Sequence, residues 1–268
     1  EKPFAKAAVD GIRSIVESNG HTLALLEKYT DNQQFLDAVA DADALIVRTR
    51  TKCDRELLEG TSVKIIATAT IGMDHIDIPY CDDKGIFYKN ASGCNSGGVM
   101  NYVFSALYGV AARKSIRLDG YTMGIVGVGS AGRMVESMAR SLGFQILKND
   151  PPRMADEGPS GFCSLDYLLE HSNIITLHVP LNENTRGMAD EDFFNKVRPG
   201  SIFINVARGE VVVDSALKAA VSKLGAVIID TWNNEPDIDE ELLDIADIAS
   251  PHIAGYSYQG KQNGTAAA

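Results

Sequence analysis

The sequence predicts an α/β fold built from two lobes, each with a doubly wound parallel sheet. Short apolar runs rich in Ile, Val and Phe alternate with segments of helical period along nearly the whole chain. The inner runs are apolar on both faces, as parallel strands covered by helices on each side require. Alternation at this pitch indicates right-handed crossovers between strands. The expected strands cover residues 44–47, 64–68, 123–128, 145–149, 173–178, 201–206, 226–230 and 247–250.

Several of the expected helices have a recognisable first turn. Three follow a residue whose side-chain oxygen can accept from the unpaired backbone N–H groups of that turn. These residues are Ser164, Asp190 and Asp214, ahead of helices over 165–169, 191–197 and 215–222. Residues 5–18 and 133–142 also have helical period.

The segment 96–113 sets the expected domain boundary. It is long and mostly apolar, and it lies directly before a glycine-rich strand, so a helix here would suit a bridge between two lobes. The expected divisions are a first lobe over 1–94, a second lobe over 95–253 and a return segment towards the first lobe over 254–268. Both ends read as cut, because the chain opens with a helical pattern where a doubly wound sheet normally begins with a strand, and 265–268 read as the opening of a helix. We therefore expect a fragment.

The composition excludes several classes of partner. With 268 residues and 45% hydrophobic residues, the chain can fill two domains of ordinary size. The balance of 25 Lys+Arg against 36 Asp+Glu gives a net charge of −11, which repels nucleic-acid phosphates and anionic lipid. No apolar run approaches the roughly 18 residues of a membrane span. We therefore expect no nucleic-acid partner and no membrane partner.

The four cysteines have neither the spacing of a metal site nor a C-x-x-C pair. They are Cys53, Cys81, Cys94 and Cys163. The start of the chain, Glu1-Lys2-Pro3-Phe4, is not a signal peptide. The sequence therefore favours a cytoplasmic protein with reduced thiols and no metal.

A glycine-rich turn predicts a dinucleotide site in the second lobe. The strand 123–128 runs into the pattern G-x-G-x-x-G and then into a helix. Gly127 permits the tight turn, Gly129 lets a pyrophosphate approach the backbone, and Gly132 lets helix and strand pack closely. The helix N-terminus presents N–H groups to the phosphates. The alternative is a turn used only for packing.

The residue after the next strand indicates which dinucleotide binds. Asp150 lies 18 residues after Gly132. Its carboxylate can accept from both ribose hydroxyls of an adenosine and would repel a 2′-phosphate, which favours NAD over NADP. Arg153 lies close by and keeps NADP open as an alternative.

Three residues at strand ends predict hydride chemistry on a hydroxy acid. Arg208, Glu235 and His252 follow three successive expected strands, at the edge where open α/β sheets bind ligands. An arginine fork can clamp a carboxylate and a carbonyl. A histidine can take the hydroxyl proton, and a paired carboxylate favours its imidazolium form. Each residue alone is more typical of a turn or loop than of a site, whereas three that follow three successive strands favour a site.

At these residues the chain resembles the D-isomer-specific 2-hydroxyacid dehydrogenases. The resemblance extends over nearly the whole chain and is carried by residues 127–132, 178–181, 205–209, 232–236 and 251–255. Within that superfamily the chain most resembles the erythronate-4-phosphate dehydrogenases, through residues 47–49, 67–75, 93–95, 150–152 and 252–261. Those enzymes oxidise 4-phospho-D-erythronate with NAD to 2-oxo-3-hydroxy-4-phosphobutanoate, an early step in bacterial pyridoxal 5′-phosphate (vitamin B6) biosynthesis.

The resemblance implies a role for each matching site residue. Arg208, Glu235 and His252 would be catalytic, with His252 as the proton donor. The implied substrate contacts are Thr49, Thr70 and Tyr256, and the implied cofactor contacts are Asp150, Val179, Ala207, Asp230 and Gly255. From the residues alone, the preferred interpretation of the two threonines is strand-end hydroxyls bonded to backbone groups.

The resemblance also implies the assembly and the lobes. It implies a Rossmann NAD-binding domain in the second lobe, a flavodoxin-like substrate domain in the first and a homodimer. We expect that this sequence lacks the family's first strand and the C-terminal dimerisation domain that would follow Ala268. The candidate cations for a substrate phosphate are Arg48, Arg50, Lys52 and Lys261. The basic cluster at 48–52 is equally typical of a solvated strand end.

We therefore predict an NAD-dependent dehydrogenase that binds a small phosphorylated hydroxy acid in the cleft between two lobes. Two alternatives stay open. One is another D-2-hydroxyacid dehydrogenase of the same superfamily, acting for example on 3-phosphoglycerate. The other is a non-catalytic module that uses the same fold to sense NAD.

Overall fold

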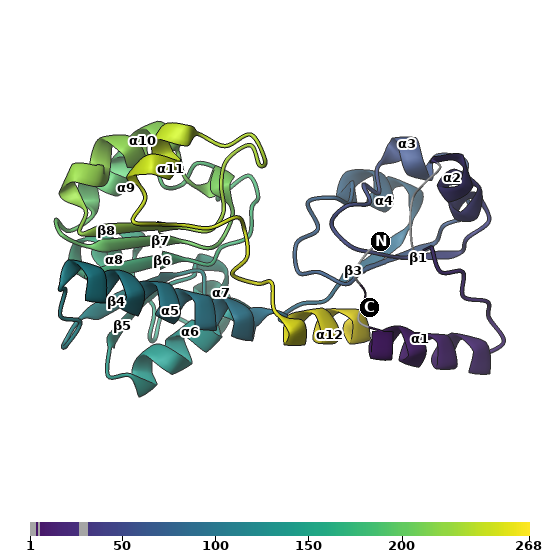
Figure 1. Ribbon diagram of the computed structural model, residues 1–268, viewed down its shortest axis with the longest axis horizontal. Helices are drawn as coiled ribbons and strands as arrows, with labels where there is room; N and C mark the ends of the chain where they lie inside the picture. Colours follow the sequence, from purple (N-terminus) through teal and green to yellow (C-terminus); the bar gives the residue numbers. More distant parts are fainter. Residues whose placement is uncertain (1–3, 5, 27–31) are drawn as a thin grey trace. The chain divides into compact units, whose positions relative to one another are not determined.

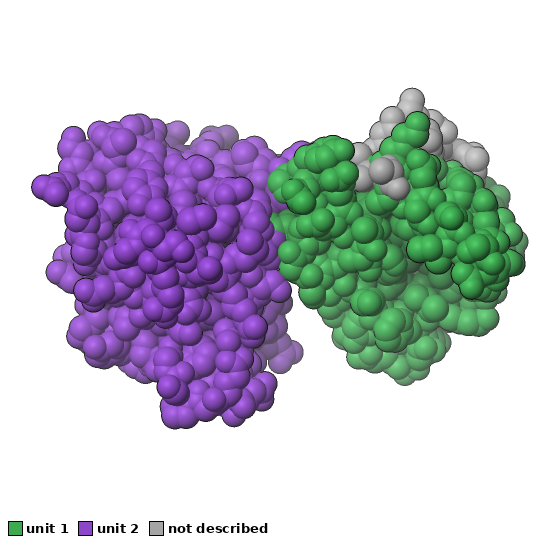
Figure 2. Space-filling view, turned by 90° about the horizontal axis from the view of Figure 1, so that it is seen from below, with its two compact units in different colours: residues 1–95, 257–268 green, residues 96–256 purple. Residues whose placement is uncertain are grey.

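The computed structural model describes residues 4, 6–26 and 32–268. The chain divides into two compact units, which are coloured separately in Figure 2. Unit 1 comprises Glu1–Asn95 and Ser257–Ala268, and unit 2 comprises Ser96–Tyr256. The sequence-based boundaries were near residue 95 and at residue 254.

The described part of unit 1 contains a three-stranded parallel sheet with the order β1-β2-β3 (Figure 1). Its strands are β1 (Ala44–Val47), β2 (Ile65–Thr68) and β3 (Phe87–Asn90). Val47 pairs with Thr68, and Thr68 pairs with Asn90, so the carboxyl ends of all three strands lie at one edge. Strand β3 was not predicted, because half of its short run is Lys and Asn and Phe87 is exposed. The doubly wound order proposed for this lobe stays a prediction.

Helices and a small apolar core complete the described part of unit 1. Its helices are α1 (Lys6–Ser18), α2 (Asn32–Ala40), α3 (Arg55–Leu58), α4 (Ile78–Lys84) and α12 (Tyr258–Ala267). The core includes Cys53, Ile66 and Cys81, all fully buried. Helix α12 packs on α1, so the last segment of the chain belongs to the first unit. The expectation that 265–268 open a helix was wrong, since α12 begins after Ser257, whose Oγ accepts from the backbone N–H of Gly260 at 3.0 Å.

Unit 2 is built on a six-stranded parallel sheet with the order β5-β4-β6-β7-β8-β9. The strands are β4 (Thr122–Val126), β5 (Gln145–Asn149), β6 (Ile174–Leu177), β7 (Ile202–Asn205), β8 (Ala226–Ile229) and β9 (Ile248–Ala249). After β5 the chain returns to the other side of β4, so the direction of winding reverses between β4 and β6. Such a switch point is where open α/β sheets bind ligands. The parallel α/β prediction is confirmed here.

The helices of unit 2 cover both faces of this sheet (Figure 1). They are α5 (Ser96–Lys114), α6 (Ser130–Ser141), α7 (Pro151–Glu157), α8 (Leu165–His171), α9 (Glu191–Lys196), α10 (Asp214–Ala220) and α11 (Glu240–Ile245), with 3₁₀ turns η1 (Gly209–Val211) and η2 (Val221–Lys223). Residues of α5 and α6 share one apolar cluster with strand residues, and residues of α8 to α11 share the other.

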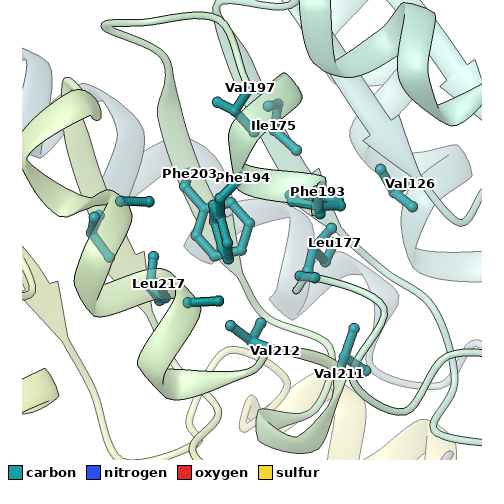
Figure 3. Close-up of a cluster of buried hydrophobic side chains, with 14 of the residues drawn as sticks. Val126, Ile175, Leu177, Phe193, Phe194, Val197, Phe203, Val211, Val212 and Leu217 are labelled. Atoms are coloured by element: carbon teal, nitrogen blue, oxygen red, sulfur yellow. The ribbon is translucent and has the colours of Figure 1, made fainter. Parts of the chain in front are cut away.

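Each face of the sheet therefore has its own core. Phe203 packs with Phe193 and Phe194 in one cluster, whereas its strand neighbours Ile202 and Ile204 belong to the other (Figure 3). Alternate residues of a strand point to opposite faces, so a strand buried on both sides must be apolar throughout. The rings of Phe194 and Phe203 meet edge to face, with centroids 5.2 Å apart.

Two of the three predicted helix caps are confirmed. Ser164 and Asp190 each accept from the backbone N–H three residues on, at 3.2 and 2.9 Å. The cap predicted at Asp214 was wrong, because this residue lies inside α10 and Val213 precedes the helix. The Asp214 carboxylate instead accepts from Nδ2 of Asn233 at 2.6 Å. The Asp214 carboxylate, which the sequence analysis assigned to capping the first turn, thus makes a tertiary contact.

Two further properties bear on function. All four cysteines are free thiols. No helix in the described part of the chain combines the length and the apolar character needed to cross a membrane.

Candidate active site

The glycine-rich turn lies at the carboxyl end of β4, next to the switch point. Gly127 has a φ of +85°, a backbone conformation that glycine adopts without steric cost. A Cβ on Gly132 would lie 2.1 Å from the carbonyl oxygen of Gly127, so α6 can pack on the turn only with glycine here. A Cβ on Gly129 would meet nothing within 4 Å. The backbone at Gly129 is therefore open at the N-terminus of α6, and this geometry fits a dinucleotide pyrophosphate.

Asp150 lies beside the same turn. Its Oδ2 accepts from the backbone N–H of Val128 at 2.7 Å, and its Oδ1 accepts from that of Arg153 at 3.1 Å. The second bond caps α7, a role that the sequence analysis missed. An ionised carboxylate has about four lone-pair sites, so acceptors remain for ribose hydroxyls. The turn and this carboxylate together fit NAD.

Asp230 holds the loop that carries His252. It follows β8 and is fully buried. Its Oδ1 accepts from Oγ of Ser250 at 2.6 Å and from N–H of Ile253 at 2.8 Å, and its Oδ2 accepts from N–H of Ala254 at 2.8 Å. Its backbone carbonyl accepts from N–H of His252 at 2.7 Å. These bonds fix His252 at a φ of +53°, a left-handed conformation that few non-glycine residues adopt.

His252 and Glu235 form a hydrogen-bonded pair. Nδ1 of His252 lies 2.9 Å from Oε2 of Glu235, and Oε1 of Glu235 accepts from the backbone N–H of Trp232 at 2.8 Å. With the carboxylate as acceptor, Nδ1 carries a proton, which leaves Nε2 as the ring nitrogen that can accept one. Burial by itself would raise the pKa of the Glu235 carboxyl, but the bonds from His252 and Trp232 and the charge of Arg208 hold that pKa below its ordinary value.

Arg208 follows β7 in a turn that Asn205 fixes. Nδ2 of Asn205 donates to the carbonyl of Arg208 at 3.0 Å, and its Oδ1 accepts from the backbone N–H of Ala207 at 3.1 Å. Nη1 of Arg208 donates to the carbonyl of Ala207 at 2.7 Å. The arginine side chain is therefore folded over its own turn at the strand end.

Close packing joins the Arg208 turn to the Glu235 loop. A Cβ on Gly209 would lie 1.9 Å from the carbonyl carbon of Trp232, so the two backbones touch. Nε1 of Trp232 donates to the carbonyl of Ser250 at 2.8 Å. This bond joins the Glu235 loop to the loop that carries His252. The structure thus brings Arg208, Glu235 and His252 to the carboxyl edge of three neighbouring strands.

The expected substrate contacts Thr49 and Thr70 lie in unit 1. They come two residues after β1 and β2, which are adjacent, so both are at the carboxyl edge of that sheet. Oγ1 of Thr70 lies 2.7 Å from that of Thr68 and donates to the carbonyl of Gly72 at 3.1 Å. Arg48 donates to the carbonyl of Ala69 at 3.4 Å. The third expected substrate contact, Tyr256, is exposed at the end of unit 2. Of the other candidate phosphate cations, Arg50 and Lys52 follow β1, and Lys261 lies in α12.

The remaining expected cofactor contacts surround the turns already described. Val179 and His178 follow β6, and a Cβ on Gly127 would lie 2.8 Å from both the His178 carbonyl carbon and the Val179 nitrogen. Ala207 precedes Arg208 and is buried, and Gly255 directly follows Ala254, whose N–H bonds to Asp230. Burial lowers the pKa of His178 to about 4, so its imidazole is neutral near pH 7. Its Nε2 lies 3.0 Å from Oγ1 of Thr176.

Sequence reasoning missed the supporting residues of the His252 loop. Oη of Tyr102 in α5 lies 2.5 Å from Oγ of Ser250, which itself donates to Asp230. Tyr102 and Ser250 are 148 positions apart, and neither belongs to a motif. No signal in one sequence could have paired them.

The comparisons with known proteins agree with this geometry. Residues 106–254 match the family described as "D-isomer specific 2-hydroxyacid dehydrogenase, NAD binding domain". The chain belongs to this family. Its relatives include erythronate-4-phosphate dehydrogenases of Bacteroides fragilis and Escherichia coli, 48% and 45% identical over 85% of this chain. The chain spans 68% and 62% of their respective lengths.

Solved structures of 2-hydroxyacid dehydrogenases share the fold. A 3-phosphoglycerate dehydrogenase of Entamoeba histolytica with NAD⁺ bound is 30% identical, with a TM-score of 0.84 over 99% of this chain and 90% of its own. A D-lactate dehydrogenase of Aquifex aeolicus complexed with NAD and lactic acid is 25% identical, with a TM-score of 0.76 over 97% and 90%. The predictions of a Rossmann domain, of NAD as cofactor and of an NAD-dependent dehydrogenase are confirmed.

Proposed function

We propose that this dehydrogenase oxidises 4-phospho-D-erythronate at C2 to 2-oxo-3-hydroxy-4-phosphobutanoate, an early step towards pyridoxal 5′-phosphate. The observation that carries the proposal is the pair formed by His252 Nδ1 and Glu235 Oε2, 2.9 Å apart beside Arg208. The substrate itself is proposed from the name of the relatives that are 45–48% identical.

The side chains supply binding and proton transfer. The guanidinium of Arg208 holds the substrate carboxylate through its two-pronged donor geometry. Nε2 of His252 takes the proton of the C2 hydroxyl as the C2–O bond becomes a carbonyl. Glu235 stabilises the resulting imidazolium through Nδ1. NAD, held by the turn at Gly129 and by Asp150, supplies the acceptor for the C2 hydride when bound.

Unit 1 is proposed as the substrate-binding lobe. Thr49 and Thr70 at the carboxyl edge of its sheet supply hydroxyl groups for the substrate, and Tyr256 supplies a third. Arg48, Arg50, Lys52 and Lys261 are the candidate ligands of the phosphate. A second candidate substrate is 3-phosphoglycerate, because a 3-phosphoglycerate dehydrogenase is the neighbour with a TM-score of 0.84.

A substrate panel tests the proposal. NADH absorbance is followed with NAD and, in turn, 4-phospho-D-erythronate, 3-phosphoglycerate and D-lactate. We expect kcat/KM for 4-phospho-D-erythronate to exceed the others by at least ~10²-fold, since a site built to bind polar groups rejects analogues that leave them unpaired. The variant His252→Asn should lower turnover at least ~10²-fold, the usual scale for a general acid or base.

Each other outcome has a distinct meaning. Faster oxidation of 3-phosphoglycerate would favour the second candidate. Binding of NADH without turnover of any substrate would contradict catalysis and favour a sensing role.

We also propose that the protein is a cytoplasmic homodimer. The four free thiols are consistent with a reducing compartment. The net charge of −11 repels anionic lipid headgroups. Sedimentation equilibrium distinguishes the 28.9 kDa chain from twice that mass. A single species at the lower mass would contradict a dimer formed by residues 1–268.

A further inference from the structure

Two arginines lie against one peptide unit of the glycine-rich turn. Val128 is the middle residue of the first G-x-G, and its carbonyl accepts from Nη1 of Arg153 at 2.7 Å and from Nε of Arg133 at 3.4 Å. The N–H of Val128 donates to Asp150 at 2.7 Å. Both guanidinium groups therefore lie at the turn that also bonds to Asp150, the carboxylate assigned above to the adenosine ribose.

A single carboxylate, Glu157, is shared by both arginines. Nε and Nη2 of Arg153 donate to Oε1 and Oε2 of Glu157, each at 2.7 Å, in a bidentate pair. Nη2 of Arg133 lies 3.5 Å from Oε1 of the same residue. The Arg153 guanidinium also lies over the ring of Phe162, 5.3 Å from its centroid. Three of the five N–H donors of Arg153 are therefore engaged, and Glu157 fills the Nε–Nη2 edge of its guanidinium.

Charge balance follows from this arrangement. The hydrogen bond from Arg153 lowers the pKa of Glu157, against a smaller opposing effect of burial, so Glu157 is ionised near pH 7. Two arginines and two carboxylates, Asp150 and Glu157, then sum to no net charge. Arginines near the ribose are what accommodates a 2′-phosphate in NADP-binding proteins of this fold. Here Arg133 and Arg153 are present, but both contact the Glu157 carboxylate.

We propose that Glu157 is a specificity-determining residue that masks Arg133 and Arg153 from the 2′-phosphate of NADP. Asp150 disfavours the phosphate by like charge, and Glu157 does so by filling the Nε–Nη2 edge of Arg153 and by pairing with Arg133 at 3.5 Å. The inference rests on the NAD-binding site described above. It deepens that assignment, because Arg153 by itself left NADP open and the contact with Glu157 explains why NAD is used.

The test compares cofactor affinities rather than turnover. Dissociation constants for NADH and NADPH are measured by fluorescence titration at low and at physiological ionic strength. The proteins are the unaltered chain, Glu157→Gln, Asp150→Ser, the double variant and a matched control, Glu241→Gln. Glu241 also loses one charge and an ion pair, with Lys218, but lies in α11. Glu157 is 46% exposed, so Glu157→Gln should fold like the unaltered chain.

We expect Glu157→Gln to lower the ratio of the NADPH to the NADH dissociation constant about 10-fold, the scale of one charge-assisted interaction gained. The control should leave that ratio unchanged, and the ratio in the double variant should lie below that in Asp150→Ser by a similar factor. The fall in the ratio should be smaller at the higher ionic strength, because the arginines are partly exposed and salt screens their charge. Adding Arg153→Ala to Glu157→Gln should return the ratio to that of the unaltered chain.

Three results would overturn the proposal. The first is the same ratio of dissociation constants in Glu157→Gln and Glu241→Gln. The second is the same ratio in the double variant and in Asp150→Ser, and the third is a ratio that stays lowered when Arg153→Ala is added to Glu157→Gln. Failure of the unaltered chain to bind NADH would instead reject the cofactor assignment, and this proposal with it. The first three results leave NADH binding intact, so the two failures are distinguishable.

Discussion

Arg208 illustrates what one side chain contributes that a similar one cannot. Lysine would keep the positive charge at the end of β7 but would lose the planar fork that pairs with a carboxylate. We predict that Arg208→Lys lowers kcat/KM by about 10²-fold, the loss of one or two charge-assisted hydrogen bonds. Affinity for NADH should be retained, because Asp150 and the glycine-rich turn are untouched.

Steady-state kinetics and an NADH titration check both parts of this prediction. Equal loss of turnover and of NADH affinity would show that Arg208 supports the fold of the cofactor site rather than the substrate carboxylate.

His178 makes the stability of unit 2 depend on pH. Burial lowers its pKa from 6.5 to about 4, so between these values the unfolded chain binds a proton that the folded chain does not. Stability is therefore lost as the pH falls from 6.5 towards 4 and levels off below it. The loss from this group is about 3 kcal/mol.

The prediction is that His178→Gln flattens this part of the pH dependence. Urea unfolding at several pH values between 4 and 7 measures it, with the exposed His21→Gln as the control. A variant whose stability falls as steeply as that of the unaltered chain would contradict the burial of a neutral imidazole.

At the scale of an element, the turn between β4 and α6 separates packing from binding. A Cβ on Gly132 would overlap the carbonyl oxygen of Gly127, whereas one on Gly129 would meet nothing within 4 Å. We predict that Gly132→Ala destabilises the protein by about 2 kcal/mol or more, the usual cost of overpacking. Gly129→Ala should leave stability unchanged and weaken NADH binding, because the methyl group occupies the approach of the pyrophosphate.

Thermal unfolding and NADH titration of the two variants form a matched pair. Unchanged NADH affinity in Gly129→Ala would place the pyrophosphate elsewhere.

At the scale of the whole molecule, each unit has its own sheet and apolar core, and the cofactor residues belong to unit 2. Trp232 is the only tryptophan in the sequence and is buried in unit 2 beside Glu235. Its fluorescence therefore reports the unfolding of this unit, whereas far-ultraviolet circular dichroism reports both.

We predict that NADH stabilises the transition seen by Trp232 fluorescence. At 100 times the dissociation constant the gain is about 2.7 kcal/mol for a ligand that binds only the folded state. Denaturant unfolding with and without NADH measures it, and the part of the circular dichroism change that belongs to unit 1 should shift less. Equal shifts of both signals would show that the units unfold as one.

The sequence was most informative where a local pattern has one physical solution. Strands apolar on both faces had to be buried between helix layers, and the predicted strands match β1, β2 and β4 to β9 to within two residues at each end. Strand β3 was missed because an edge strand with an exposed face lacks that apolar signal. Arg208, Glu235 and His252 could be proposed together, because parallel strands bring their carboxyl ends to one edge.

What the sequence by itself determined is the family, the order of helices and strands, the glycine-rich turn and the residue types of the site. Only the tertiary structure decided which side chains support that site. The bond of Ser250 to Asp230, the contact of Asp214 with Asn233 and the sharing of Glu157 by two arginines have no local signature. A side chain close to several possible partners is assigned to one of them by the packing of distant segments, and a single sequence does not record that packing.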